Sequence, residues 1–134
     1  MDSIKQVIVM RKDLNMRKGK MIAQGSHASI AFITNRLNKP YSYKDGDKII
    51  LQARFSPEEL EWIEGSFTKI VVYVNSLEEL QDIHAKAKEA GLESNLIIDS
   101  GYTEFAGVKT PTCIAIGPDK SSKIDEITQH LPLL

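Results

Sequence analysis

Five polar residues of this chain combine groups that could direct the attack of water on a carbonyl: Lys20, His27, Asp99, Thr103 and Thr112. A carboxylate beside a lysine can orient or deprotonate a water molecule, while the lysine stabilises negative charge on an attacked carbonyl oxygen. Threonine hydroxyls can hold the water or the substrate by hydrogen bonds. Spacing alone leaves a plainer interpretation open, in which these are a solvated cation, a packed helix histidine, a turn former and ordinary strand or loop residues.

A dense group of cations leads into the apolar, helix-like segment that follows Lys20. It comprises Arg11, Lys12, Arg17, Lys18 and Lys20. The first turn of a helix offers unpaired N–H groups and the positive end of the helix dipole, so a helix that starts here would suit a phosphate-bearing partner. Gly19 allows close approach to the backbone. A merely solvated loop is the alternative.

The net charge of −1 conceals a polarised distribution. Residues 1–37 hold seven Lys and Arg side chains against Asp2 and Asp13, a net charge of +5, so the remaining residues sum to −6. Such a field draws an anionic macromolecule to one face, and the acidic remainder discourages indiscriminate wrapping of nucleic acid.

Several classes of protein are disfavoured by composition. The apolar runs are far shorter than the ~20 residues of a membrane span, and residues 1–6 lack a signal-peptide layout, so we expect a cytoplasmic protein without a membrane segment. Cys113 is the only cysteine and reads as a small core residue. The histidines and the cysteine lack metal-ligand spacing, so neither a metal nor another cofactor is expected.

Strand-like and helix-like segments alternate along the chain and must position these groups. Apolar runs predict strands at 5–11, 69–74, 95–98 and 112–116. Periodic or capped segments predict helices at 18–37, closed by Pro40, at 76–90 and at 121–131. Residues 38–68 form an enlarged excursion with a turn at 44–48 and a short helix that opens at Ser56.

This order of elements predicts one α/β domain over residues 1–134, with a small, mostly parallel or mixed four-stranded sheet and helices on both faces. Ligands of such sheets gather at the carboxyl ends of strands, beside helix starts. The end of the first strand, the start of the first helix and Asp99 should therefore lie together.

Three segments in this order resemble the type 2 peptidyl-tRNA hydrolases of archaea, eukaryotes and some bacteria. They are residues 11–28 (RKDLNMRKGKMIAQGSHA), 99–104 (DSGYTE) and 112–118 (TCIAIGP). The resemblance covers nearly the whole chain outside the excursion. It implies hydrolysis of the ester that joins a peptide, or another N-blocked aminoacyl group, to the 3′-terminal ribose of tRNA. It also implies a homodimer.

The resemblance implies active-site roles for Lys20, Asp99, Thr103 and Thr112. We expect Asp99 to orient or activate water and Lys20 to counter charge on the tetrahedral intermediate. His27 matches a motif position too, where a supporting or packing role suits it best.

Substrate contacts are expected around these groups. The cations expected to hold tRNA phosphates are Arg11, Lys12, Arg17 and Lys18. Tyr102 stands where many relatives carry Arg and could stack on the terminal adenine or pack. Two other classes remain open at this point, a non-catalytic RNA-binding module and a protein-interaction domain on the same fold.

Overall fold

A four-stranded mixed sheet forms the centre of the molecule, in a computed structural model that describes residues 2–37 and 43–134. The order of its strands is β4-β1-β6-β5. Their bounds are Ile4–Arg11 for β1, Lys69–Val74 for β4, Ser94–Asp99 for β5 and Thr110–Lys120 for β6. The β1–β4 pair is parallel and the pairs of β6 with β1 and β5 are antiparallel, so the sheet is mixed rather than mostly parallel.

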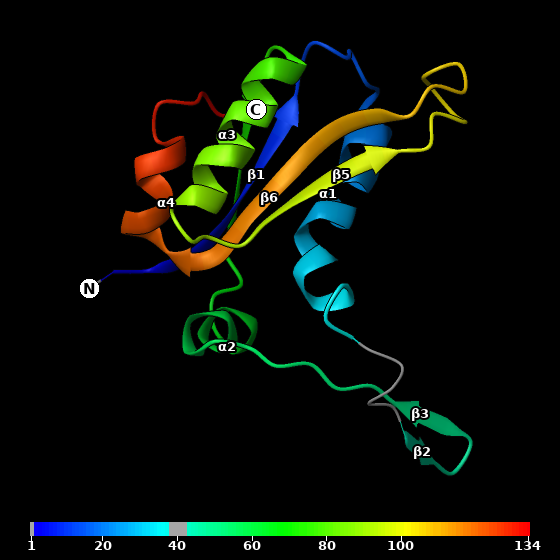
Figure 1. The fold of residues 1–134 in the computed structure, drawn as a ribbon, viewed down its shortest axis with the longest axis vertical. Coiled ribbons are helices and arrows are strands. Elements are labelled where there is room, and N and C mark those ends of the chain that lie inside the picture. The colour runs from blue at the N-terminus through cyan, green and yellow to red at the C-terminus, as the bar shows by residue number, and fades with distance from the viewer. Residues whose placement is uncertain (1, 38–42) are drawn as a thin grey trace.

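Helices cover both faces of this sheet, as predicted (Figure 1). One face carries α1 (Lys18–Thr34), and the other carries α3 (Leu77–Glu89) and α4 (Ser121–Thr128). Side chains of β1 alternate between the two layers: Val7 and Val9 join the core cluster of α3 and α4, whereas Ile8 and Met10 join the cluster beneath α1. This period of two is that of a strand buried on both faces.

Three predicted ends differ from the structure by three residues or more. Helix α4 ends at Thr128, three residues before the predicted end at 131. The first helix ends at Thr34, three residues before the predicted end, where the N–H groups of Arg36 and Leu37 both bond to the carbonyl of Ile33. The expected stop at Pro40 lies outside the described residues. The last strand continues to Lys120, since β1 resumes its pairing beyond Gly117, which adopts a φ of +89°.

The part of the excursion that is described contains a hairpin and a helix. The hairpin joins β2 (Tyr43–Asp45) to β3 (Lys48–Ile50) through a turn with Gly46 at a φ of +67°. Helix α2 (Pro57–Glu64) opens with the predicted cap, because the Ser56 hydroxyl accepts a bond from the Glu59 N–H while the Glu59 carboxylate accepts one from the Ser56 N–H.

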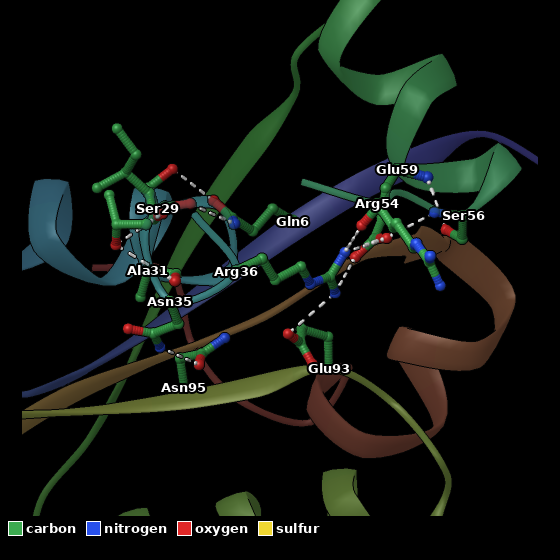
Figure 2. A network of polar contacts seen from close by, with 12 residues as sticks. Gln6, Ser29, Ala31, Asn35, Arg36, Arg54, Ser56, Glu59, Glu93 and Asn95 are labelled. Carbon is green, nitrogen blue, oxygen red and sulfur yellow. Dashed lines mark hydrogen bonds and ion pairs between the residues drawn. The ribbon is translucent and has the colours of Figure 1, made fainter. Parts of the chain in front are cut away.

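A partly buried ion pair fastens α2 to the end of α1 (Figure 2). Arg36 donates to both carboxylate oxygens of Glu59 at 2.7 Å and to Glu93 at 3.1 Å. Burial by itself raises the pKa of Glu59, but the bonds from Arg36 and Ser56 outweigh it and hold that pKa below its ordinary value. The excursion is therefore tied to the same helix that carries Lys20 at its other end.

We predict that Glu59→Gln lowers the free energy of unfolding by about 1–3 kcal/mol, because Arg36 loses its bidentate partner in a half-buried place. Denaturant titration measures the change. The exposed Glu61→Gln serves as the matched control and should leave stability within about 0.5 kcal/mol of the wild type. Equal effects of the two substitutions would show that the ion pair contributes nothing.

Candidate active site

Lys20 and Asp99 meet where the first turn of α1 lies against the end of β5. The Lys20 Nζ donates to Asp99 Oδ1 at 2.8 Å and to Thr103 Oγ1 at 2.7 Å. The side chains of Lys20 and Asp99 are 13% and 10% exposed, so the pair is largely sheltered but still open to solvent. Three of the five residues singled out in the sequence are thus brought into direct contact.

The carboxylate of Asp99 is held on both oxygens. Its Oδ1 accepts bonds from Lys20 and from Gln24 Nε2, and its Oδ2 accepts a bond from the Gly101 N–H at 2.9 Å. The bond from Lys20, aided by those from Gly101 and Gln24 and opposed by desolvation, lowers the pKa of Asp99 below its ordinary value. A carboxylate oxygen has about two acceptor sites, so with respect to the described part of the chain the remaining one on Asp99 belongs to Oδ2.

Donors also remain in this cluster. Lys20 uses two of its three ammonium protons on Asp99 and Thr103, which leaves one for a further acceptor. The Thr103 hydroxyl accepts from Lys20, and the residue is exposed, so its own proton can reach a bound molecule. The site can therefore offer a negative acceptor and two donors, one of them cationic, to a water molecule and a polar substrate.

Gln24 is a site residue to which the sequence reasoning gave no role. It is 2% exposed and bridges two candidates: its Nε2 donates to Asp99 at 3.2 Å and its Oε1 accepts from Thr112 Oγ1 at 2.6 Å. The signal for it was its position four residues after Lys20, on the same face of α1.

Thr112 lies behind the site rather than in it. Its side chain is fully buried, and its hydroxyl is bonded to Gln24 and, at 3.5 Å, to the Ile97 carbonyl. The expectation that Thr112 holds water or substrate directly therefore does not fit this placement. Its contact with Asp99 runs through the amide of Gln24.

The loop between β5 and β6 is folded back over its own start. Gly101 has a φ of +87°, and a Cβ there would meet the backbone of Val108 at 2.2 Å, so only glycine fits. The Gly107 N–H bonds to the Gly101 carbonyl at 2.9 Å. This packing holds the Gly101 N–H against Asp99 and leaves Tyr102 pointing into solvent, 88% exposed.

The cations expected to face phosphates do not share one environment. Arg11 is bound internally, with two bonds to Asp13 and one to the Pro111 carbonyl, and its side chain is 11% exposed. It braces the loop after β1 rather than facing solvent. Lys12, Arg17 and Lys18 are exposed, Lys12 lying over the Tyr73 ring and Arg17 pairing with Glu104 at 3.3 Å.

His27 is also exposed, and no bond joins it to Lys20, Asp99 or Thr103 within the described part of the chain. The packed position expected for this histidine is therefore not seen in the single chain.

The start of α1 differs from the starts of α2 and α3. Those helices have a bonded serine cap and two glutamates each in the first turn. Helix α1 begins after Arg17 with no side-chain cap and no acidic residue in its first turn. An uncapped helix start beside exposed cations is electrostatically suited to an anion.

Other chemistry finds little support in the described residues. Within 2–37 and 43–134, no group of three His, Cys, Asp or Glu side chains is arranged to hold a metal ion. Burial raises the pKa of the Cys113 thiol to about 11, so it is not a thiolate near neutrality. No helix in these ranges is long and apolar enough to cross a bilayer.

The amino-acid sequence of this chain is similar to those of known proteins. The family model described as Peptidyl-tRNA hydrolase PTH2 matches residues 4–134. This chain belongs to the type 2 peptidyl-tRNA hydrolase family. A "Peptidyl-tRNA hydrolase" of Methanocaldococcus jannaschii is 42% identical over 132 residues, covering 98% of this chain and 100% of that protein.

Two further relatives agree with this family assignment. The protein of the same name from Methanothermobacter thermautotrophicus is 44% identical over 133 residues, with 98% and 100% coverage. A "Probable peptidyl-tRNA hydrolase 2" of Dictyostelium discoideum is 40% identical over 129 residues, which are 96% of this chain and 54% of that protein. The resemblance seen in the sequence is therefore confirmed at the level of the family.

For this type 2 hydrolase we predict that Gln24→Met reduces kcat roughly 10- to 100-fold, because Asp99 loses a bond that fixes its orientation. The free energy of unfolding should fall by about 1–2 kcal/mol as well, since the buried Thr112 hydroxyl loses a partner. Gln6→Met is the matched control: Gln6 is fully buried and bonded to Ser29, away from this cluster. It should lower stability and leave kcat near wild type. Equal loss of kcat in both variants would show that Gln24 acts only on folding.

We also predict that Asp99 produces no acid limb in the pH profile of kcat/KM near neutrality. Because the pKa of Asp99 is lowered, the carboxylate is ionised at every pH above the ordinary pKa of 3.8. It becomes protonated only as the pH falls below that value. The profile should therefore stay flat with respect to this group down to about pH 5. An acid limb centred above about pH 5 that vanishes in Asp99→Asn would contradict the assignment.

Proposed function

We propose that this chain hydrolyses the ester between a peptide, or another N-blocked aminoacyl group, and the 3′-terminal ribose of tRNA. The observation that carries the proposal is the contact of Lys20 with both Asp99 and Thr103 beside an uncapped, cationic helix start. An ester has a good enough leaving group that a positioned water and a stabilised oxyanion suffice. Since tRNA and its peptidyl esters belong to translation, we place the activity in the cytoplasm.

The free acceptor site of Asp99 Oδ2 defines the role of that carboxylate. Water bonded there is oriented towards the ester carbonyl and passes a proton to the Asp99 carboxylate as the new C–O bond forms. That proton is returned to the ribose oxygen as the ester C–O bond breaks. Because the pKa of Asp99 is lowered, the carboxylate is a weak base in the resting enzyme, and its main contribution is orientation. Gln24 and Thr112 act as positioning residues that hold it.

Lys20 supplies the charge that the reaction needs. Its remaining proton faces the developing negative charge on the attacked carbonyl oxygen, and its charge is worth more in this sheltered position than in open water. The Thr103 hydroxyl donates a hydrogen bond to the substrate. The products are the free peptide acid and tRNA with its terminal hydroxyl restored.

The exposed cations bind the acceptor end of tRNA. Lys12, Arg17 and Lys18 contact phosphates, with the free N–H groups of the first turn of α1 beside them. Such contacts carry no sequence information and weaken steeply with salt. Arg11 is assigned to holding the loop after β1, because three of its five N–H donors have protein partners and its side chain is only 11% exposed.

We predict that Lys20→Met and Asp99→Asn each lower kcat on peptidyl-tRNA by roughly 10²- to 10³-fold, as expected when a charged group next to the reacting atoms is removed. Binding of uncharged tRNA should stay within a few-fold of wild type. Arg17→Gln with Lys18→Gln should do the reverse, raising the Kd for tRNA and flattening its salt dependence while kcat is kept. Release of labelled peptide and filter binding of tRNA measure the two effects.

Full turnover by both Lys20→Met and Asp99→Asn would exclude this site as the place of reaction. Binding of tRNA without release of peptide by the wild-type protein would instead support the RNA-binding module.

A homodimer is the second part of the proposal. An apolar groove of about 700 Å³ lies between α1 and the β4 side of the sheet. Its rim exposes large apolar side chains: Ile22 at 70%, Ile30 at 50%, Phe67 at 49% and Leu134 at 46%. A soluble protein rarely leaves so apolar a surface uncovered, and a second copy of the chain can bury it against the same groove.

We predict that Ile22→Glu shifts the protein from dimer to monomer in sedimentation velocity, since a carboxylate in an apolar interface is left unpaired. Leu60→Glu is the matched control, because Leu60 is 47% exposed on α2 and does not line the groove. A wild-type protein that sediments as a monomer, or an Ile22→Glu variant that stays dimeric, would contradict this interface.

A further inference from the structure

We propose that the outer edge of β5 binds the peptide part of the substrate as an added, extended strand. The inference rests on the function proposed above and on its placement at Asp99. It assigns the peptidyl group, which the catalytic cluster does not itself hold, to a surface of this chain.

The two edge strands of the sheet differ in whether another segment of the chain pairs with them. The β4 edge is covered by the end of the chain: the Tyr73 N–H bonds to the Pro132 carbonyl, the Leu134 N–H bonds to the Val71 carbonyl, and Val72 forms a bridge with Leu133. The β5 strand is the other outermost strand. Within the described ranges, no strand pairs with its outer side. An uncovered edge is a template for another extended chain.

Exposure along β5 agrees with an open edge. None of its six residues is fully buried, and Ile98 is 56% exposed. The neighbouring strands β6 and β1 are buried over most of their length. Figure 1 shows α3 and α1 on opposite faces of the sheet, and both helices contact β5 on those faces.

The direction of the main-chain groups can be read from the bonds on the inner side. The Glu93 carbonyl accepts from the Gly117 N–H at 2.8 Å, and the Ile97 carbonyl accepts from the Thr112 hydroxyl. Odd-numbered residues therefore face β6. Since neighbouring residues of a strand direct their N–H and C=O to opposite sides, Ser94 and Leu96 direct theirs to the open side.

Among residues 2–37 and 43–134, no strand pairs with these outward groups, and they lead towards the catalytic cluster because β5 ends at Asp99. A peptide whose ester carbonyl lies at Lys20 and Asp99 can run along β5 away from the site, with its C-terminal residue next to Asp99. Asp99 itself meets the ester, so the other five residues of β5, 94–98, can pair with about five residues of an extended peptide, which has the same rise of about 3.3 Å per residue.

The chemistry of the substrate favours this mode of binding. The peptides carried by tRNA have the same main-chain chemistry but differ in the sequence of their side chains. An enzyme for all of them gains general affinity by bonding main-chain groups, as strand addition does. Side-chain pockets would instead restrict the peptides that it accepts.

A substrate series tests the inference without any change to the protein. KM should fall as the peptide on tRNA grows from one N-acetylated residue to about five and then level off, with kcat unchanged. N-methylation of alternate main-chain nitrogens of a pentapeptidyl-tRNA should raise KM roughly fivefold for each bond lost. Methylation of the intervening nitrogens should have little effect.

A protein variant gives the complementary test. Leu96→Pro removes an outward N–H at an edge, where proline is tolerated, and Leu96→Ala controls for the lost side chain. Leu96→Pro should raise KM for pentapeptidyl-tRNA about fivefold relative to Leu96→Ala. Both should hydrolyse N-acetyl-aminoacyl-tRNA equally, which also shows that the proline variant is folded.

Two results would overturn the inference. One is a KM that is the same for one and for five residues and insensitive to N-methylation. The other is a Leu96→Pro variant that changes only the oligomeric state, which would make the edge a contact between copies of this chain. If the wild-type protein hydrolysed neither substrate, the proposed function itself would fail, an outcome distinct from both.

Discussion

The ion pair between Lys20 and Asp99 joins the first turn of α1 to the last residue of β5 across 79 residues of sequence. It forms only if α1 covers one face of the sheet and if β6 passes between β1 and β5. The Gln24 bridge to Thr112 on β6 and the bond from Gly101 in the loop both converge on the same carboxylate. Helix, sheet and loop therefore meet at one charged group, and the position of that group depends on all three.

The same arrangement separates binding from chemistry. Lys20 is sheltered and donates hydrogen bonds to Asp99 and Thr103. Arg17 and Lys18, one turn or less away, are exposed. A helix start without a cap leaves its N–H groups available next to these exposed cations. In the proposed mechanism the sheltered charge of Lys20 acts on the reaction, and the exposed charges act on long-range attraction and salt-sensitive binding.

Sequence patterns predicted most of the elements because each has a strong local cause. Ser56 and Ser76 cap their helices, β1 carries an uninterrupted apolar run, and Gly91 follows α3 at a φ of +77°. The proximity of Lys20 to Asp99 could also be predicted from the sequence, since strand ends and helix starts gather at one edge of such sheets.

The roles of other residues depended on three-dimensional partners that no local pattern contains. Arg11 was expected to bind phosphate from its place in the cation group, and no local pattern shows that three of its N–H donors bond to Asp13 and to the Pro111 carbonyl. Thr112 looked like a substrate contact, yet the strand order buries it behind Gln24. The pairing of the chain end with β4, which leaves β5 as the open edge, likewise follows from tertiary packing alone.

The most direct test of this account is a double-mutant cycle on kcat/KM for peptidyl-tRNA, made with Lys20→Met, Asp99→Asn and the double variant. If the two side chains act as one unit, the double variant will be little worse than the more impaired single variant. Losses that simply multiply would show that Lys20 and Asp99 act independently, and would contradict a site built on their contact.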